Sequence, residues 1–200
     1  MELAEKKREL RRLALGRRDA LSASERAAAS RAVCRSLEEL PELRGAKTVL
    51  GYAAVGSECD LAALYASLAE RGVTLAFPVC GEDGRMEAFV PAGALVPGRF
   101  SIPEPDPAAS RRLAPEELDA VLVPCAGFDA EGKRLGRGGG YYDRYLARCP
   151  QAAAILTAFE TQRLAYVPFG EHDLSFSVLV TENGVLRRTN DKLTARSSQE

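Results

Sequence analysis

The sequence predicts an α/β fold, a single three-layer domain with a mostly parallel β-sheet covered by helices on both faces. Short apolar runs typical of buried strands alternate along the chain with amphipathic helical patterns, which favours a parallel sheet. The chain has 200 residues, of which 46% are hydrophobic, so it can bury one substantial core. We therefore expect one domain over residues 1–188, followed by a polar, disordered tail at 189–200.

The first predicted helix spans residues 2–18. Its apolar residues Leu3, Leu10, Leu13 and Ala14 recur at spacings that place them on one helical face. This face is expected to pack against the rest of the domain.

The remaining elements follow from capping, periodicity and turn residues. Ser22 and Glu25 have the spacing of a capping box, so they predict the start of a second helix that runs toward Pro41. Further helices are expected at 60–71 and from about residue 141. Strands are predicted at 47–52, 73–78, 86–90, 118–124, 152–159, 176–180 and 185–188. The segment 91–107, rich in Pro and Gly, is expected to be a folded loop. In such a fold, ligands bind at the carboxyl ends of the strands.

The composition argues against several classes of function. The formal net charge is −1 and the pI is near 6.0, so we expect neither a nucleic-acid partner nor a membrane surface. The five cysteines are scattered and form no Cys-X-X-Cys pair, which favours reduced thiols. No secretory-signal pattern is present, and we expect a cytoplasmic protein. His172 is the only histidine, so any chemistry must use carboxylates, cations and backbone groups.

One segment combines the features of a phosphate-binding loop. It reads Arg134-Leu-Gly-Arg-Gly-Gly-Gly-Tyr-Tyr-Asp143 and directly precedes a predicted helix. Glycines let the backbone approach a ligand closely, and N–H groups at a helix start favour an anion. The Walker spacing does not fit because no Lys-Ser or Lys-Thr follows, and the dinucleotide-binding spacing does not fit because Tyr141 stands where glycine or alanine is needed. A flexible surface turn is the alternative interpretation.

Charged side chains in two places could serve this loop. Arg134 and Arg137 add positive charge within it, while Asp143 could hold Mg²⁺ or could simply be an acid favoured in the first turn of a helix. Lys7 and Arg11 lie four residues apart on the first helix, so both can converge on one anion. The alternative for that pair is a solvated basic face.

In its wider context, from Val123 to Leu146, the loop resembles the signature of the 5-formyltetrahydrofolate cyclo-ligases, also called methenyltetrahydrofolate synthetases. Other landmarks of that family occur in the right order over nearly the whole chain. They are Lys7-Arg-Glu-Leu-Arg11, Glu58, Phe77-Pro78, Met86 to Phe89, Ile102-Pro-Glu104-Pro, and His172-Asp173 leading into Val180-Thr181-Glu182.

The resemblance implies an enzyme that uses Mg²⁺ and ATP to convert 5-formyltetrahydrofolate into 5,10-methenyltetrahydrofolate, with release of ADP and phosphate. ATP would phosphorylate the formyl oxygen, which makes that oxygen a leaving group and its carbon a better electrophile. Such a transfer depends on positioning and charge neutralisation, which suits a chain with a single histidine. The expected partners are the folate substrate and ATP, and we expect a monomer.

The resemblance also implies roles for individual residues. ATP would be bound by Lys7, Arg8, Arg11, Arg134, Leu135, Gly136, Arg137, Gly138, Gly139, Gly140, Tyr141 and Tyr142. The folate substrate would be bound by Ala53, Glu58, Arg137, Gly138, Gly139, Gly140 and Tyr141. Asp143 and Asp173 would hold Mg²⁺, and Arg137 and Tyr141 would be catalytic.

Some of these positions carry a second interpretation or depart from the family. Glu58 would accept hydrogen bonds from the pterin ring, whereas Tyr141 could also serve only in packing the helix on the sheet. Ala53 stands where relatives carry larger apolar residues, and Gly139 where some carry lysine. His172 is expected to be a structural neighbour of Asp173 rather than a catalyst.

Two other functions remain as alternatives. A sugar-phosphate isomerase or coenzyme A transferase would share the fold, although fold analogy alone does not establish function. A non-catalytic folate- or nucleotide-binding relic of the enzyme is the other alternative. Retention of Glu58, Arg137, Asp143 and Asp173 together argues against a relic.

Overall fold

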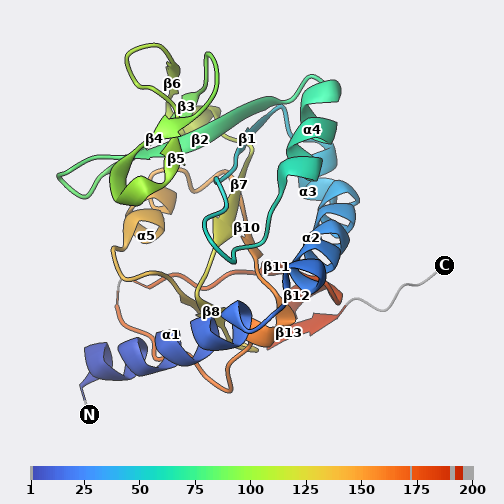
Figure 1. Cartoon of the computed structure of the whole chain (residues 1–200), viewed down its shortest axis with the longest axis vertical. Coiled ribbons are helices and arrows are strands. Elements are labelled where there is room, and N and C mark those ends of the chain that lie inside the picture. Colours follow the sequence, from blue (N-terminus) through green and yellow to red (C-terminus); the bar gives the residue numbers. More distant parts are fainter. Residues whose placement is uncertain (1, 172, 190–191, 196–200) are drawn as a thin grey trace.

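The computed structural model describes residues 2–171, 173–189 and 192–195 (Figure 1). The α-helices are α1 (Leu3–Asp19), α2 (Ala23–Glu38), α3 (Pro41–Arg44), α4 (Ala62–Glu70) and α5 (Tyr141–Leu146). The strands of the main sheet are β1 (Thr48–Leu50), β2 (Thr74–Cys80), β3 (Met86–Val90), β6 (Arg111–Leu113), β7 (Ala120–Pro124), β10 (Ala153–Thr157), β11 (Val178–Thr181), β12 (Gly184–Thr189) and β13 (Lys192–Ala195). Short elements elsewhere are β4 (Val96–Pro97), β5 (Pro103–Glu104), β8 (Gly127–Phe128), β9 (Arg134–Leu135), and the 3-10 helices η1 (Arg99–Ser101), η2 (Pro115–Glu117) and η3 (Glu160–Gln162).

The nine-stranded main sheet is mixed, with a parallel centre. Its strand order is β13-β12-β11-β10-β7-β1-β2-β3-β6. The five strands from β11 to β2 run parallel, whereas the two strands at each edge pair antiparallel. The predicted α/β fold is confirmed, and its parallel part is confined to the middle of the sheet.

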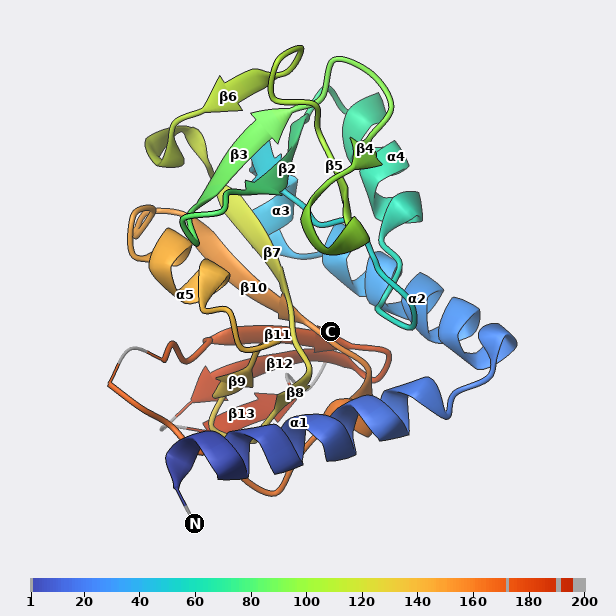
Figure 2. The same ribbon diagram turned by 60° about the vertical axis from the view of Figure 1, so that its left-hand side comes forward.

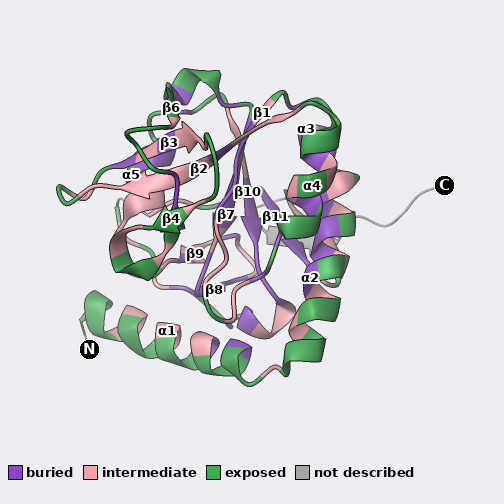
Figure 3. Ribbon diagram, turned by 45° about the horizontal axis from the view of Figure 1, so that its top comes forward, coloured by how far each residue is buried: buried purple, intermediate pink, exposed green. Residues whose placement is uncertain are grey.

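Helices cover both faces of this sheet. In β7, Ala120 and Leu122 face the core under α2, α3 and α4, while Val121 and Val123 face the core under α5. All four residues are fully buried, as expected for a central strand covered on both sides. Figure 3 shows this pattern, with buried residues in the central strands and exposed residues on the outer sides of the helices.

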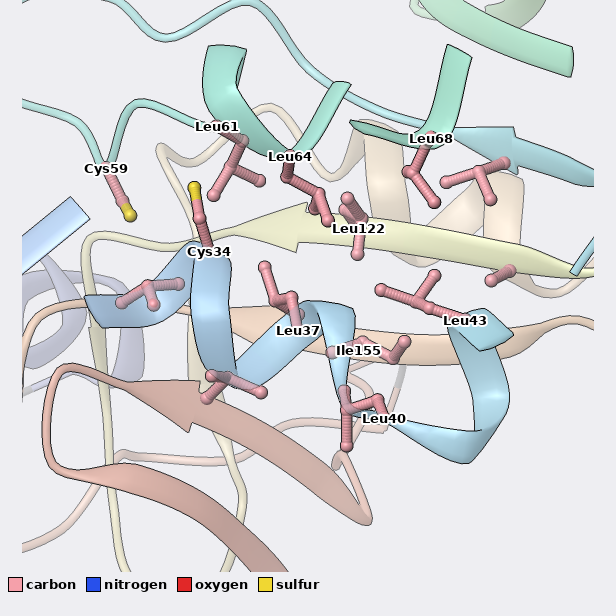
Figure 4. Close-up of a cluster of buried hydrophobic side chains, with 14 of the residues drawn as sticks. Cys34, Leu37, Leu40, Leu43, Cys59, Leu61, Leu64, Leu68, Leu122 and Ile155 are labelled. Atoms are coloured by element: carbon pink, nitrogen blue, oxygen red, sulfur yellow. The ribbon is translucent and has the colours of Figure 1, made fainter. Parts of the chain in front are cut away.

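The first core contains the leucines of three helices. Figure 4 shows Leu37 of α2, Leu64 of α4 and Leu122 of β7 pointing toward one another. The capping box predicted at the start of α2 is present: the Ser22 hydroxyl accepts from the Glu25 N–H at 3.2 Å, and the Glu25 carboxylate accepts from the Ser22 N–H at 2.7 Å. The cap fixes the start of the helix that supplies much of this core.

Helix α1 lies apart from the two layers and crosses beneath the sheet beside β8 and β9 (Figure 2). Its contact is a narrow line in which Leu10 and Ala14, four residues apart, pack against Leu135, Leu164 and Val167. The predicted apolar face was therefore too wide. Leu3 and Leu13 are 48% and 46% exposed, because the helix rests on loops rather than on a broad sheet surface.

Two regions carry more strand than predicted. The folded loop at 91–107 contains the short β4–β5 ribbon, and the edge strand β6 follows it. The prediction of a disordered tail was wrong for residues 192–195, which pair with β12 as β13. The polarity of this segment concealed it, because an antiparallel edge pair is held by backbone hydrogen bonds. Residues 190–191 and 196–200 of the predicted tail lie outside the described residues, and the domain boundary stays a prediction.

Two expectations from composition can be compared with the structure. All five cysteines are free thiols, and four of them are buried. Among the described residues, no helix is both long enough and apolar enough to cross a membrane.

The long connection between β7 and α5 is an ordered hairpin. Asp129, fully buried, accepts hydrogen bonds from the backbone N–H groups of Glu131, Lys133 and Val167 at 2.8–3.0 Å. The turn ends at Gly132, whose φ of 77° is left-handed. A Cβ at this glycine would lie 2.2 Å from the Phe176 carbonyl oxygen. Only glycine fits here without moving the backbone.

We expect Gly132→Ala to lower the free energy of unfolding by more than about 3 kcal/mol, because it combines an unfavourable φ with a backbone clash. Gly56→Ala is the matched control, since Gly56 also has a left-handed φ of 64° but has open space around its Cβ position. That variant should lose only about 1–2 kcal/mol. Urea denaturation measures both, and equal losses would contradict the steric explanation.

Candidate active site

A cavity of about 480 Å³ opens at the carboxyl ends of β1, β2 and β7. This is the position expected for ligands in an open α/β sheet. Residues from α1, the segment after β1 and the glycine loop at 134–143 line it together. The predicted site residues that line the cavity are Lys7, Arg11, Ala53, Glu58, Arg134, Leu135, Gly136, Arg137, Gly138, Gly139, Gly140, Tyr141, Tyr142, Asp143 and Asp173. The structure thus brings together predicted residues that are up to 166 positions apart in the sequence.

Arginine side chains fasten the glycine loop from several sides. Arg11 Nε donates to the Gly136 carbonyl at 2.7 Å, and Arg134 Nε donates to the Pro124 carbonyl at 2.9 Å. Arg144 Nη2 donates to the Gly139 carbonyl at 2.8 Å. These hydrogen bonds hold the loop in place although it is rich in glycine, which argues against the interpretation as a flexible surface turn.

The loop reaches helix α5 through left-handed glycines. Gly138 has a φ of 108°, and Gly140, which caps α5, has a φ of 64°. Both values lie where side chains with a Cβ are strained, so glycine is required at these two positions. Successive backbone turns of this kind are typical of anion-binding nests.

Helix α1 contributes two of its three predicted cations, Lys7 and Arg11, to the same cavity. Lys7 forms an ion pair with Asp173, while Arg11 binds the loop at Gly136. Burial lowers the pKa of the Arg11 guanidinium, which nevertheless stays protonated at neutral pH. Arg8 is exposed and does not line the cavity, because one step along a helix turns the side chain by about 100°.

Glu58 lies on the cavity wall in a polar network. Its side chain is only 8% exposed, and its Oε2 accepts from the Val55 N–H at 3.0 Å. Its Oε1 accepts from Arg137 at 2.8 and 3.1 Å, and Arg18 lies 3.9 Å from the same oxygen. Two guanidinium groups therefore compensate the desolvation of this carboxylate.

Arg18 was not among the predicted site residues, although it shapes the site. Its side chain is 7% exposed and donates to the Ser57 hydroxyl at 2.8 Å. The signal in the sequence was its position, because Arg11 and Arg18 are seven residues apart and so share a helical face.

The two aspartates predicted to hold Mg²⁺ both line the cavity. Asp143 pairs with Arg134 at 3.5 Å, and Asp173 Oδ2 accepts from the Gly170 N–H at 2.6 Å in addition to its ion pair with Lys7. Within the described part of the chain, no three His, Cys, Asp or Glu side chains cluster as a complete metal site. His172, the expected neighbour of Asp173, lies outside the described residues.

Two aromatic residues of the site, Tyr141 and Tyr142, both line the cavity and pack against the hydrophobic core. Tyr141 lines the cavity and lies under the Arg144 guanidinium, whose carbon is 5.5 Å from the ring centroid. Tyr142 lies in the same way beside Arg134 at 5.3 Å, and burial raises the pKa of its hydroxyl. Both tyrosines also pack against the hydrophobic core under α5. Lining the cavity and packing the helix on the sheet are therefore compatible roles.

Further residues of the cavity were missed as site residues. Most of them belong to the segments that carry the resemblance to the cyclo-ligase family. Their position in those segments is the signal that could have identified them. They are Pro78, Met86, Ile102, Glu104, Pro124 and Cys125, joined by Tyr52, Cys80 and Phe100 from elsewhere. Burial raises the pKa of the Glu104 carboxyl.

The two thiols of the cavity are protonated at neutral pH. Burial raises the pKa of Cys80 to about 11 and that of Cys125 to about 12. A nucleophilic cysteine needs the thiolate form. The cavity therefore offers cations, carboxylates and backbone groups for its chemistry rather than a cysteine nucleophile.

Fold and site together define an α/β protein whose cavity, at the carboxyl ends of the strands, presents a glycine loop together with cationic side chains. The family model for the 5-formyltetrahydrofolate cyclo-ligase family matches residues 3–182. The chain belongs to this family, and it is therefore a ligase of folate metabolism.

Individual relatives agree with this assignment. The 5-formyltetrahydrofolate cyclo-ligase of Mycolicibacterium smegmatis is 32% identical over 70% of this chain and 76% of its own length. That of Haemophilus influenzae is 29% identical over 80% of this chain and 89% of its own length. The solved 5,10-methenyltetrahydrofolate synthetase of Aquifex aeolicus superposes with a TM-score of 0.79 at 34% identity, covering 97% of this chain and 96% of that one.

We expect Arg18→Gln to lower the free energy of unfolding by about 1–3 kcal/mol, because it leaves Glu58 less well compensated and Ser57 without a donor. Arg12→Gln is the matched control on the same helix, where the side chain is exposed. It should change stability by less than about 0.5 kcal/mol. Equal effects of the two substitutions in urea denaturation would contradict the role given to Arg18.

Proposed function

We propose that the chain converts 5-formyltetrahydrofolate into 5,10-methenyltetrahydrofolate in this cavity, with ATP as the phosphoryl donor. One observation carries the proposal: Lys7 and Arg11 of α1 meet the glycine loop and Glu58 in a single cavity. A phosphate-binding half and a half suited to a polar ring thus adjoin each other. Membership of the cyclo-ligase family supports the same reaction.

The chemistry needs activation of an amide oxygen. The formyl oxygen on N5 would attack the γ-phosphorus of ATP, and ADP would leave. N10 would then attack the activated carbon, lose its proton, and expel the oxygen as phosphate. Both steps depend on holding charged groups in line, and this does not require a protein nucleophile. The protonated thiols of the cavity agree with such a mechanism.

The cations would divide the work of neutralising the polyphosphate. Lys7 and Arg11 approach from α1 and Arg137 from the loop, so the transferred group would lie between two positively charged walls. Arg137 is 49% exposed and pairs with Glu58 here. We infer that substrate binding moves the Arg137 guanidinium from Glu58 toward the phosphate, which frees Glu58 to accept from the pterin ring.

Asp143 and Asp173 are the residues that fit Mg²⁺. Magnesium in nucleotide sites is commonly bound by one or two carboxylates, with waters and phosphate oxygens completing the shell. Two carboxylates in a cavity lined by phosphate-binding groups match that donor set. The ion would neutralise charge on the transferred group. The roles of Tyr141 as an aromatic wall and of Ala53 in the folate pocket are proposals of the same kind.

The direct test is an assay for the methenyl product, whose formation is measured by its ultraviolet absorbance. Purified chain with 5-formyltetrahydrofolate, ATP and Mg²⁺ should form the product, and omission of ATP or addition of a chelator should stop the reaction. Tight folate binding without product formation would contradict the proposal and support a non-catalytic relic.

We expect Asp143→Asn to lower kcat by about a hundredfold or more, because a lost metal ligand acts mainly on the transferred phosphoryl group. Folate binding should change by less than about twofold, as measured by calorimetry. Asp83→Asn is the control, since Asp83 is 57% exposed in the turn between β2 and β3. Unchanged turnover in Asp143→Asn would remove this residue from the reaction.

A further inference from the structure

A second recess lies beside the active site and is lined by residues in or next to β3, β6 and α5. Figure 2 shows these three elements on the left-hand side of the molecule. It measures about 480 Å³, and its charged and hydroxyl-bearing walls are Arg85, Glu87, Arg112, Arg144, Tyr145 and Arg148. We call it the arginine recess. Met86 lines both the recess and the active-site cavity, so the two are neighbours. Of the six residues only Arg144 also serves the active site, because it holds the glycine loop.

The recess carries more positive than negative charge. Glu87 is shared between Arg148, at 3.0 and 3.2 Å, and Arg112, at 3.0 Å. Arg85 pairs at 3.3 Å with Asp83, which lies outside the recess. Arg144 donates to the backbone carbonyls of Gly84 and Gly139, which carry no charge. Four guanidinium groups thus line the recess, and only two carboxylates pair with them, Glu87 inside the recess and Asp83 outside it.

The guanidinium groups remain open to a ligand. The side chains of Arg85 and Arg112 are 79% and 59% exposed, and that of Arg148 is 40% exposed. A planar guanidinium group can donate two parallel hydrogen bonds to two oxygens of one phosphate or carboxylate. The cations that line the recess are all arginines.

Tyr145, which lines the recess, carries a buried hydroxyl that supports the same interpretation. Tyr145 is 1% exposed, and its hydroxyl is the one buried side-chain N or O atom among the described residues that lacks a hydrogen-bond partner. The Arg148 guanidinium lies over its ring at 5.4 Å. Buried hydroxyls in native proteins are nearly always satisfied, so an unpaired one beside a cluster of cations indicates a missing acceptor.

We propose that the arginine recess binds a multiply charged oxyanion of small size, a polyphosphate or a polycarboxylate. The guanidinium groups of Arg85, Arg112 and Arg148 bind its oxygens, and the Tyr145 hydroxyl donates to one of them. Arg144 closes the wall toward the glycine loop. The site is distinct from the one that the proposed reaction uses for ATP.

The test is calorimetric titration of the metal-free chain with inorganic pyrophosphate and, separately, with citrate, which distinguishes a phosphate from a carboxylate ligand. The recess variant is Arg85→Gln with Arg112→Gln. The matched control is Arg111→Gln, because adjacent residues of a strand point to opposite faces, and Arg111 does not line the recess. Arg144 stays unchanged in all variants because it also contacts the glycine loop.

At least one of the two anions should bind the wild type and Arg111→Gln alike and bind the recess variant at least about tenfold more weakly. Tyr145→Phe should also weaken binding, while its free energy of unfolding without anion stays at or above that of the wild type, because no partner is lost. The proposal is overturned if neither anion binds, or if the recess variant binds both as well as Arg111→Gln does. Turnover of the recess variant should match that of the control, which separates this site from the proposed function.

Discussion

The attachment of the glycine loop by arginine side chains is the constraint on which the active site depends. A segment with glycines at 136, 138, 139 and 140 has high backbone entropy when unattached. Arg11 and Arg144 donate to the carbonyls of Gly136 and Gly139, and Arg134 binds the start of the region to the Pro124 carbonyl, so the three arginines hold it in one conformation. The same arginines bring positive charge to the loop, so the groups that order the backbone also prepare it for an anion.

Helix α1 is the second element of this arrangement. Its apolar contact with the domain runs through Leu10 and Ala14, Arg18 is buried against Ser57, and the cations Lys7 and Arg11 also take part in its attachment. Binding of a polyphosphate would therefore compete with or reinforce contacts that hold the helix. In the proposed reaction, ligand binding and docking of α1 would be coupled through these two side chains.

Glu58 illustrates why the site is polar inside a largely apolar fold. A buried carboxylate is costly unless it is paired and hydrogen-bonded, and here Arg18, Arg137 and a backbone N–H share that role. Arg18 is buried and structural, whereas Arg137 is half exposed and able to exchange partners. This difference in exposure separates the cation that supports the carboxylate from the one that would respond to substrate in the proposed reaction.

Local pattern and tertiary packing determined different parts of this protein. Periodicity, capping and glycine spacing act within a few residues, so the sequence alone determined the strand β7, the start of α2 and the close turns of the glycine loop at 134–143. Tertiary structure decided that α1 lies across the sheet, that Arg18 rather than Arg8 reaches the site, that β13 pairs at the edge, and that an arginine recess adjoins the cavity. Those outcomes depend on distances between segments that are remote in sequence, and only packing of the whole chain sets such distances.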